Sequence, residues 1–484
     1  MAVKEPVVND ADGVLAAAPS AATFEVTSPA TFEAVRQADQ DHVMSTYARY
    51  PLALVRGRGT RVWDSEGRAY LDFIGGIAVN VLGHCHPAVT AAITKQARTL
   101  IHASNLFYTL PYVELAGLLA KTGVPGPVFF CNSGAEATEG AIKLARKFAG
   151  ATGRKGRRIV AVEGGFHGRT MGALAATGKP QFWQGFEPLP PGFVHVPFND
   201  VGALEKAFSP GATGSETGDR AAADPADAPC AVILEVIQGE AGVRPTSPEF
   251  LAAARELCDR QGALLIIDEV QTGLGRTGTF WAFQGAAGAG AAGAGAAGLR
   301  PDVMTAAKGL GGGLPIGFFS ARDEVAAVLR PGDHGSTFGA NPVACAAAVV
   351  TVSEILKPGF LDHVREMGAE LNGRLADMAA AFPGAARAAR GKGLMAALEM
   401  ASADLAQAVL DGCRAGGVLV NRTAGNVIRL LPPLTVTQRE VRRATAALRG
   451  ATAEAARPAG VACPPNAPSG RAGSFLFETS SMSI

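Results

Sequence analysis

Short apolar runs recur along the middle of the chain, and stretches with helical spacing separate them. The runs read as buried strands at residues 128–131, 159–162, 231–234, 264–267 and 302–304. Residues 136–148 predict one intervening helix, whose apolar face carries Ala141, Ile142, Ala145 and Phe148. Buried strands that alternate with helices predict an α/β fold, in which a mostly parallel sheet is flanked by helices.

The pattern changes after about residue 341. A long helical stretch leads to segments 393–400 and 427–431, which predicts a smaller α+β domain at 341–454. Low-complexity composition sets four other segments apart. We expect residues 1–41 to be a mostly disordered extension, 455–484 a peripheral tail, and 209–228 and 285–298 mobile surface loops.

Composition narrows the class of protein. The 484 residues are 48% hydrophobic and 18% charged, as expected for a soluble α/β enzyme with two domains. A net charge of +1 gives no electrostatic case for nucleic acid or a membrane surface. Seven scattered cysteines without a CxxC pair predict reduced thiols. No signal pattern or apolar span is found, so we expect a cytoplasmic protein.

No metal site is expected. The only short metal-like cluster is His84-Cys85-His86, and no second ligand group supports it. A turn before Pro87 is the simpler interpretation.

Two of the predicted strands lead to ionisable residues. Segment 264–267 ends at Asp268, and segment 302–304 is followed by Lys308 and a glycine-rich turn. A partly desolvated lysine has a lowered pKa and attacks carbonyl groups. Pyridoxal phosphate enzymes use such a pair, because the lysine holds the aldehyde and the carboxylate holds the pyridine nitrogen. The pair therefore predicts pyridoxal phosphate as the cofactor, while a helix N-cap at Asp268 is the plainer alternative.

The loop Asn132-Ser133-Gly134-Ala135-Glu136 is a candidate phosphate site. Its small residues let backbone N–H groups approach an anion at a helix N-terminus, and the Ser133 hydroxyl adds a donor. An ordinary N-cap at Ser133, with Glu136 at the third helical position, explains the same residues.

Other strand ends carry further candidates. Phe166 suits a stack on an aromatic cofactor and Arg169 a forked bond to a carboxylate, although a core phenylalanine and a surface ion pair are the alternatives. Gln271 is placed to reach the phenolic oxygen of the cofactor. Ser336 and Thr337 offer hydroxyls in a tight turn, where local bonds to the backbone are the alternative.

Several more motifs occur in a fixed order. They are Thr46-Tyr47-Ala48-Arg49-Tyr50-Pro51, Gly75-Gly76-Ile77-Ala78-Val79-Asn80, His102-Ala103-Ser104-Asn105-Leu106-Phe107-Tyr108-Thr109, Gln238-Gly239-Glu240, Asp268-Glu269-Val270-Gln271-Thr272-Gly273 and Arg390-Gly391-Lys392-Gly393-Leu394-Met395. With the segments above, the chain from about residue 47 to 448 resembles the class III pyridoxal phosphate aminotransferases. The resemblance implies the pyridoxal phosphate fold type I and a homodimer with its sites at the interface. It also implies that residues 42–92 join the small domain and that 93–340 form the large cofactor-binding domain.

The resemblance implies a role for each matching residue. Lys308 would anchor the cofactor and carry the proton, and Asp268 would pair with the pyridine nitrogen. Cofactor contacts are implied for Ser133, Gly134, Ala135, Phe166, Val270, Gln271 and, from the other subunit, Thr337. Substrate contacts are implied for Tyr47, Arg169, Ser336, Glu240 and Arg390. Arg390 would bind a second carboxylate, and Glu240 would neutralise Arg390 when that carboxylate is absent.

Within the family, the chain resembles the acetylornithine aminotransferases. That resemblance implies transfer of the δ-amino group of N2-acetyl-L-ornithine to 2-oxoglutarate, giving N-acetyl-L-glutamate 5-semialdehyde and L-glutamate in arginine biosynthesis. Ile77 agrees with it, because ornithine aminotransferases tend to carry a tyrosine there that helps hold a free α-amine. Ornithine, succinylornithine, succinyldiaminopimelate and 4-aminobutyrate aminotransferases remain alternatives.

Overall fold

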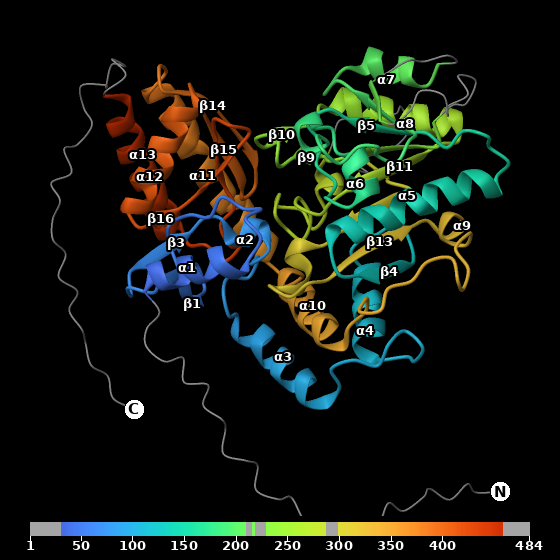
Figure 1. Ribbon diagram of the computed structural model, residues 1–484, viewed down its shortest axis with the longest axis horizontal. Helices are drawn as coiled ribbons and strands as arrows, with labels where there is room; N and C mark the ends of the chain where they lie inside the picture. The colour runs from blue at the N-terminus through green and yellow to red at the C-terminus, as the bar shows by residue number, and fades with distance from the viewer. Residues whose placement is uncertain (1–30, 210–214, 218–228, 287–298, 458–484) are drawn as a thin grey trace, which may run out of the picture. The chain divides into compact units, whose positions relative to one another are not determined.

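The computed structural model describes residues 31–209, 215–217, 229–286 and 299–457 (Figure 1). The chain divides into two compact units. The first holds the described residues of 1–56 together with 63–68, and the second holds 57–62 and the described residues from 69 onward. All candidate site residues except Tyr47 belong to the second unit.

The first unit contains helix α1 (Phe32–His42) and parts of strands β1 (Leu54–Arg58) and β2 (Arg61–Asp64). The Thr31 hydroxyl caps α1 by accepting a hydrogen bond from the Ala34 N–H at 3.3 Å. No residue of α1 is buried. Residues 32–41 of the expected, mostly disordered extension at 1–41 form this helix, and residues 1–30 lie outside the described residues.

In the described part of the chain, eight strands form one sheet in the order β4-β13-β12-β11-β8-β5-β6-β7. Their bounds are Val128–Cys131 (β4), Ile159–Val162 (β5), Phe193–Val196 (β6), Ser215–Thr217 (β7), Ala231–Leu234 (β8), Leu264–Asp268 (β11), Val303–Ala306 (β12) and Gly317–Ala321 (β13). Neighbours are parallel from β12 to β6, whereas β13 and β7 run antiparallel to their neighbours. The five predicted strands and the mostly parallel sheet are confirmed.

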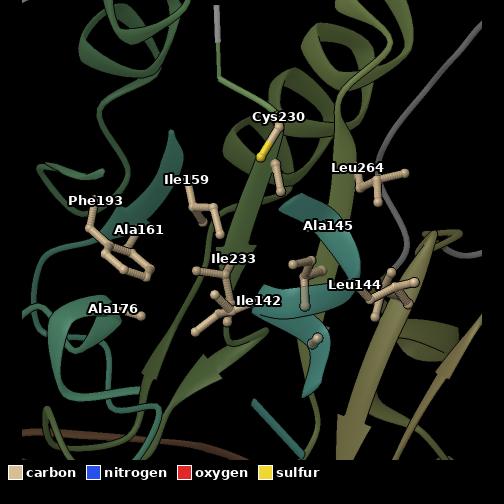
Figure 2. Packing of buried hydrophobic residues seen from close by; sticks show 14 of the residues in the cluster. Ile142, Leu144, Ala145, Ile159, Ala161, Ala176, Phe193, Cys230, Ile233 and Leu264 are labelled. Atoms are coloured by element: carbon tan, nitrogen blue, oxygen red, sulfur yellow. The ribbon is translucent and has the colours of Figure 1, made fainter. Parts of the chain in front are cut away.

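Helix α5 (Gly134–Ala151) packs on this sheet and confirms the helix predicted at 136–148. Figure 2 shows Ile142 and Ala145 of α5 in one buried cluster with Ile233 of β8. A Cβ on Gly140 would collide with the Phe319 ring of β13, so glycine permits the close approach of helix and sheet. Burying an isoleucine or leucine stabilises the fold by about 1.5–3 kcal/mol. This packing holds the N-terminus of α5 at the edge where the strands end.

The C-terminal part contains a second sheet of four antiparallel strands, in the order β14-β15-β18-β17. Their bounds are Ala386–Lys392 (β14), Met395–Met400 (β15), Asn421–Thr423 (β17) and Val427–Leu430 (β18). Helices α11 (Phe360–Ala381) and α12 (Ala403–Ala415) pack on this sheet, and α13 (Gln438–Ala456) packs against these two helices. β15 and β18 occupy the segments 393–400 and 427–431 singled out in the sequence.

The remaining elements are short or connect the two sheets. The helices are α2 (Gly75–Ala78), α3 (Pro87–Thr99), α4 (Leu110–Ala120), α6 (Met171–Ala176), α7 (Val201–Ala207), α8 (Pro248–Gln261), α9 (Asp323–Ala326) and α10 (Pro342–Ile355), with 3-10 turns η1 (Pro180–Phe182), η3 (Ala282–Gly285) and η4 (Lys308–Gly311). The strands are β3 (Ala69–Asp72) with its parallel partner β16 (Val418–Leu419), and the antiparallel pair β9 (Ile237–Gln238) and β10 (Arg244–Pro245).

The low-complexity segments lie largely outside the described residues. Within 209–228, the backbone of residues 215–217 forms edge strand β7 rather than a loop, and it pairs with β6. Residues 210–214, 218–228 and 287–298 are not described, nor is the tail beyond 457. The six cysteines in the described part are all free.

The described residues include the short apolar helix α4. No single helix there has the length and apolar composition needed to cross a membrane, and α10 and α11 meet that requirement only as a pair bent by 73°.

Candidate active site

A pocket of about 480 Å³ lies where strands β4, β5, β8, β11 and β12 end. This is the edge at which open α/β sheets bind ligands. The pocket is lined by Val79, Asn132, Ser133, Gly134, Ala135, Phe166, His167, Gly168, Arg169, Glu235, Glu240, Asp268, Val270, Gln271, Ala307, Lys308, Gly313, Leu314, Pro315 and Ile316. Ten of the predicted site residues are therefore brought together, and Tyr47, Ser336, Thr337 and Arg390 do not line it.

The N-terminus of α5 forms one wall of the pocket. Ser133 caps the helix, because its Oγ accepts a hydrogen bond from the Glu136 N–H at 3.2 Å. A Cβ on Gly134 would lie 2.8 Å from Cγ1 of Val270, so only glycine fits beside that side chain. Ser133 is thus a helix cap and a pocket residue at once. Helix N-termini of this kind attract anions through their free N–H groups and the helix dipole.

Asp268 lies at the end of β11 with only 3% of its surface exposed. One carboxylate oxygen accepts the Val270 N–H at 2.9 Å, and the other lies 2.8 Å from Nδ1 of His167. Burial lowers the pKa of His167, but the hydrogen bond and charge of Asp268 outweigh it and raise that pKa overall. No helix begins at Asp268, so the N-cap alternative does not apply. The pair therefore joins two buried polar side chains of the pocket lining.

Glu235 and His167 are pocket residues to which the sequence had given no role. Glu235 follows β8 and is buried, and its carboxylate accepts the N–H groups of Phe166 at 2.9 Å and Gly239 at 3.2 Å. Burial raises the pKa of Glu235 to about 7, although the charge of His167 opposes the shift. The rule that drew attention to Asp268, an ionisable residue directly after a buried strand, applies equally to Glu235.

Lys308 follows β12 in the 3-10 turn η4 and faces the pocket. Its φ of 41° is unusual for a residue with a side chain, and such backbone strain concentrates at functional sites. Burial lowers the pKa of its amine, against the opposing charges of Glu240 and Asp268. Among the described residues its Nζ makes no hydrogen bond, so the amine is available to react.

Glu240 pairs with Arg429 of β18. The Arg429 guanidinium is 1% exposed, and Nη1 donates to Glu240 Oε1 at 2.6 Å and to Gln271 Oε1 at 3.1 Å. Asn421 on neighbouring β17 accepts from Nε and Nη2 of the same guanidinium. The charge of Arg429 keeps the pKa of Glu240 below its usual value even though burial opposes this.

This geometry corrects the expected pairing of Glu240 with Arg390. Arg390 lies on β14, donates to Glu399 at 2.5 Å and to the Gly242 carbonyl at 2.7 Å, and does not reach Glu240. Arg390 of β14 and Arg429 of β18 both pair with Ala397 of the strand between them, β15. The two arginines are therefore in the same register and two strands apart. Two strand spacings amount to roughly 9–10 Å, and of these two arginines only Arg429 contacts the pocket residues Glu240 and Gln271.

The other predicted substrate residues are more exposed. The Arg169 guanidinium carbon lies 3.7 Å above the centre of the Phe182 ring and 5.6 Å from that of Phe166. Ser336 Oγ accepts hydrogen bonds from Asn132 and from the Gly339 N–H, whereas Thr337 is exposed. Tyr47, in the first unit, is 75% exposed.

The pocket residues fit pyridoxal phosphate. The α5 N-terminus suits a phosphate, buried Asp268 suits a protonated pyridine nitrogen, and the amine of Lys308 suits an aldehyde. Phe166 and Val270 supply apolar surface for an aromatic ring. The described residues contain no group of three or more His, Cys, Asp or Glu arranged to bind a metal.

Comparison with known proteins agrees with this chemistry. Residues 43–451 match the family described as Aminotransferase class-III. The chain is 46% identical over 404 residues to the acetylornithine aminotransferase of Caldanaerobacter subterraneus subsp. tengcongensis, which covers 83% of this chain and 95% of that protein. Among solved structures, ornithine aminotransferase from Toxoplasma gondii matches with a TM-score of 0.79 and 32% identity, covering 89% of this chain and 96% of that one.

A second solved structure, N-acetylornithine aminotransferase from Stenotrophomonas maltophilia, matches with a TM-score of 0.69 and 35% identity, covering 86% of this chain and 98% of that one. The matches span almost the whole described chain and include every residue of the pocket. The chain therefore belongs to the class III aminotransferase family, whose members are pyridoxal phosphate-dependent transaminases.

Proposed function

We propose that this enzyme transfers the δ-amino group of N2-acetyl-L-ornithine to 2-oxoglutarate, as a step of arginine biosynthesis. The relatives that carry the name acetylornithine aminotransferase support this substrate. The structural observation that carries the proposal is the bond from buried Arg429 to Glu240, a residue that lines the same pocket as Lys308.

Pyridoxal phosphate, when bound, supplies an aldehyde that takes up the amino group and a ring that delocalises electrons. Ser133, Gly134 and Ala135 would hold its phosphate, Phe166 and Val270 would flank its ring, and Gln271 would hydrogen-bond its phenolic oxygen. Asp268 would hold the pyridine nitrogen in its protonated form, and the hydrogen bond to His167 fixes the orientation of the Asp268 carboxylate.

Lys308 supplies the reactive amine. Because its pKa is lowered, a larger fraction of Nζ is neutral near pH 7 and able to attack a carbonyl carbon. The same nitrogen then accepts and returns a proton at the substrate carbon. No other lysine lines the pocket, so a neighbouring amine does not replace it.

Arginines explain how one pocket serves two different substrates. N-acetylornithine has one carboxylate, far from its reacting amine, and Arg169 at the pocket mouth is placed to bind it. Glutamate has a second carboxylate next to its reacting amine, and we assign Arg429 to bind that group. When acetylornithine is present, Glu240 keeps Arg429 neutralised, which avoids an unpaired buried charge.

Substrate choice is tested by kinetics on the holoenzyme. We expect faster turnover of N2-acetylornithine than of ornithine, because apolar Ile77 offers nothing to a charged α-amine. The rival activity is that of an ornithine aminotransferase. Two solved structures that resemble this chain carry that name and come from Toxoplasma gondii. Steady-state rates on both amines, with succinyldiaminopimelate and 4-aminobutyrate as further donors, decide between them. Faster turnover of ornithine would refute the named substrate.

We further propose that the enzyme is a homodimer in which Thr337 reaches the site of the other subunit. Thr337 is exposed and lies outside its own pocket. Mixing Thr337→Ala chains with Lys308→Ala chains tests this, because a mixed dimer would have one site that lacks both residues and one intact site. Activity restored by mixing supports the proposal, and none restored although mixed dimers form contradicts it. Three further expectations stay proposals. They are a substrate role for Tyr47, the domain bounds 42–92, 93–340 and 341–454, and a cytoplasmic location.

A further inference from the structure

A second pocket of about 410 Å³ lies beside the one described above. It is lined by Phe198, Ala241, Arg244, Pro245, Arg390, Glu399, Ala424, Asn426 and Val427. None of these residues belongs to the lining of the active pocket. The two pockets are nevertheless joined through one segment, because Glu240 faces the first and Ala241 faces the second.

The charges in this second pocket do not balance. Arg390 is paired with Glu399 at 2.5 Å. Arg244 stacks on Phe198, with its guanidinium carbon 4.0 Å from the ring centre, and has no carboxylate partner among the described residues. Arg390 lines the same pocket as Arg244. Burial lowers the pKa of Arg244, and the charge of Arg390 lowers it further. One positive charge in the pocket therefore lacks a counter-charge.

The remaining walls indicate what kind of anion fits. Pro245, Val427 and two alanines present apolar surface, and the stacked ring of Phe198 holds the guanidinium in a fixed plane. A guanidinium fork matches the planar geometry of a carboxylate. We propose that this pocket binds a small organic carboxylate, held by Arg244 and seated against the apolar wall. The site is separate from the substrate pocket.

The segment that carries Glu240 is held from both sides. The carbonyl of Glu240 accepts hydrogen bonds from Lys179 Nζ at 2.7 Å and Thr423 Oγ1 at 2.8 Å. Two residues on, the Gly242 carbonyl accepts from Arg390 at 2.7 Å. An occupant that binds Arg244 and Arg390 contacts this same segment, so it changes how readily Glu240 leaves Arg429. Binding of a carboxylate at Arg244 does not depend on the proposed reaction. Its effect on the release of Glu240 from Arg429 rests on the proposed function.

Calorimetric titration of the holoenzyme with malonate tests the binding site directly, with malonamide as the neutral analogue. We compare the wild type with Arg244→Ala, Arg169→Ala and Arg387→Ala, the last being an exposed arginine on the same strand as Arg390. We expect a malonate-binding event that Arg244→Ala weakens at least about tenfold, and that Arg169→Ala and Arg387→Ala leave in place. Arg244→Lys keeps the charge but loses the fork, so it should weaken binding less and serves if the alanine variant folds poorly.

Several results would overturn the proposal. Malonate binding that only Arg169→Ala removes would place the anion in the substrate pocket. Equal binding of malonamide would exclude charge recognition, and tighter binding of inorganic phosphate would exclude a carboxylate site.

The kinetic arm measures inhibition by malonate against 2-oxoglutarate. Occupation of both pockets predicts mixed inhibition in the wild type and purely competitive inhibition in Arg244→Ala. Purely competitive inhibition in both proteins would refute the coupling to Glu240. If the enzyme has no activity with 2-oxoglutarate, the proposed function fails while the calorimetric result still stands or falls by itself.

Discussion

The end of the eight-stranded sheet and the face of the four-stranded sheet contribute to the active pocket in different ways. Asp268 and Lys308 reach the pocket because they follow strands β11 and β12, which run parallel and end at one edge. Arg429 of β18 contacts the pocket residues Glu240 and Gln271, and Arg390, two strands away on β14, does not. The sequence predicts that a residue directly after a parallel strand lies at the ligand-binding edge of the sheet. The neighbours of a residue within an antiparallel sheet depend instead on the order and register of the strands.

The largest expected effect tests the first of these regions. Lys308→Ala should abolish turnover while the protein still folds, because one amine serves as anchor and proton carrier. Borohydride reduction of the holoenzyme followed by peptide mapping locates the anchored lysine. Label on Lys179, the lysine bonded to the Glu240 carbonyl, would move the reactive amine away from the strand end.

Asp268→Asn should retain much of the cofactor but lower the rate by on the order of a thousandfold. An amide does not keep the pyridine nitrogen protonated, so the negative charge that develops on the substrate carbon loses its stabilisation. Bound cofactor is measured by absorbance and the rate by single turnover. Near-normal turnover in a fully loaded variant would remove Asp268 from this role.

The two arginines of the C-terminal sheet form a matched pair of variants. Arg429→Ala should slow the half-reaction with glutamate or 2-oxoglutarate by about a hundredfold, since charge-assisted bonds to a carboxylate are lost. Its effect on the acetylornithine half-reaction should be smaller. Arg390→Ala should leave both half-reactions within about threefold of the wild type. Single-turnover absorbance, with the amine donor and the oxo acid added separately, measures each half.

A larger loss of rate with glutamate or 2-oxoglutarate in Arg390→Ala than in Arg429→Ala would make Arg390 the residue that binds the second carboxylate. Equal losses in both half-reactions for Arg429→Ala would contradict the division of labour between Arg169 and Arg429.

The smallest expected effect concerns the pH dependence of stability. The pKa of Glu235 is raised from 4.5 to about 7 in the folded state, mainly by burial. The folded protein therefore binds a proton there more tightly than the unfolded chain, so its contribution to stability is present below pH 4.5 and is lost as pH rises through 7. Glu235→Gln should make the decline of Tm over this range shallower.

Glu269 provides a control outside the pocket lining. It is also buried, its pKa is also raised from 4.5 to about 7, and Glu269→Gln should flatten the Tm profile in the same direction. Only Glu235→Gln should also disturb kcat, because Glu235 holds the Phe166 and Gly239 N–H groups. An unchanged Tm profile in Glu235→Gln would show that this carboxyl group titrates normally.

Much of the pocket could be predicted because its residues follow local rules. Ser133 combines a strand end with a helix cap, and Gly134 and Ala135 leave room for an anion beside it. Glu235 obeys the same strand-end rule and was overlooked, as was the partnership of His167 with Asp268. That partnership joins a residue of the loop after β5 to the last residue of β11, and no spacing in the chain reveals it. Helix α1 was missed because it follows directly on a segment of low-complexity composition.

The sequence by itself determined the strands of the large sheet, the edge at which they end, and the reactive lysine and carboxylate placed there. Those features depend on hydrophobic periodicity and on the short reach of a loop, which are properties of neighbouring residues. Only the tertiary structure decided which arginine meets Glu240. Arg390 and Arg429 both interrupt strand segments of the same sheet, and their separation arises from the order β14-β15-β18 and the shared rung at Ala397. Pairing between distant segments selects one of two chemically equal side chains, and composition or spacing does not distinguish them.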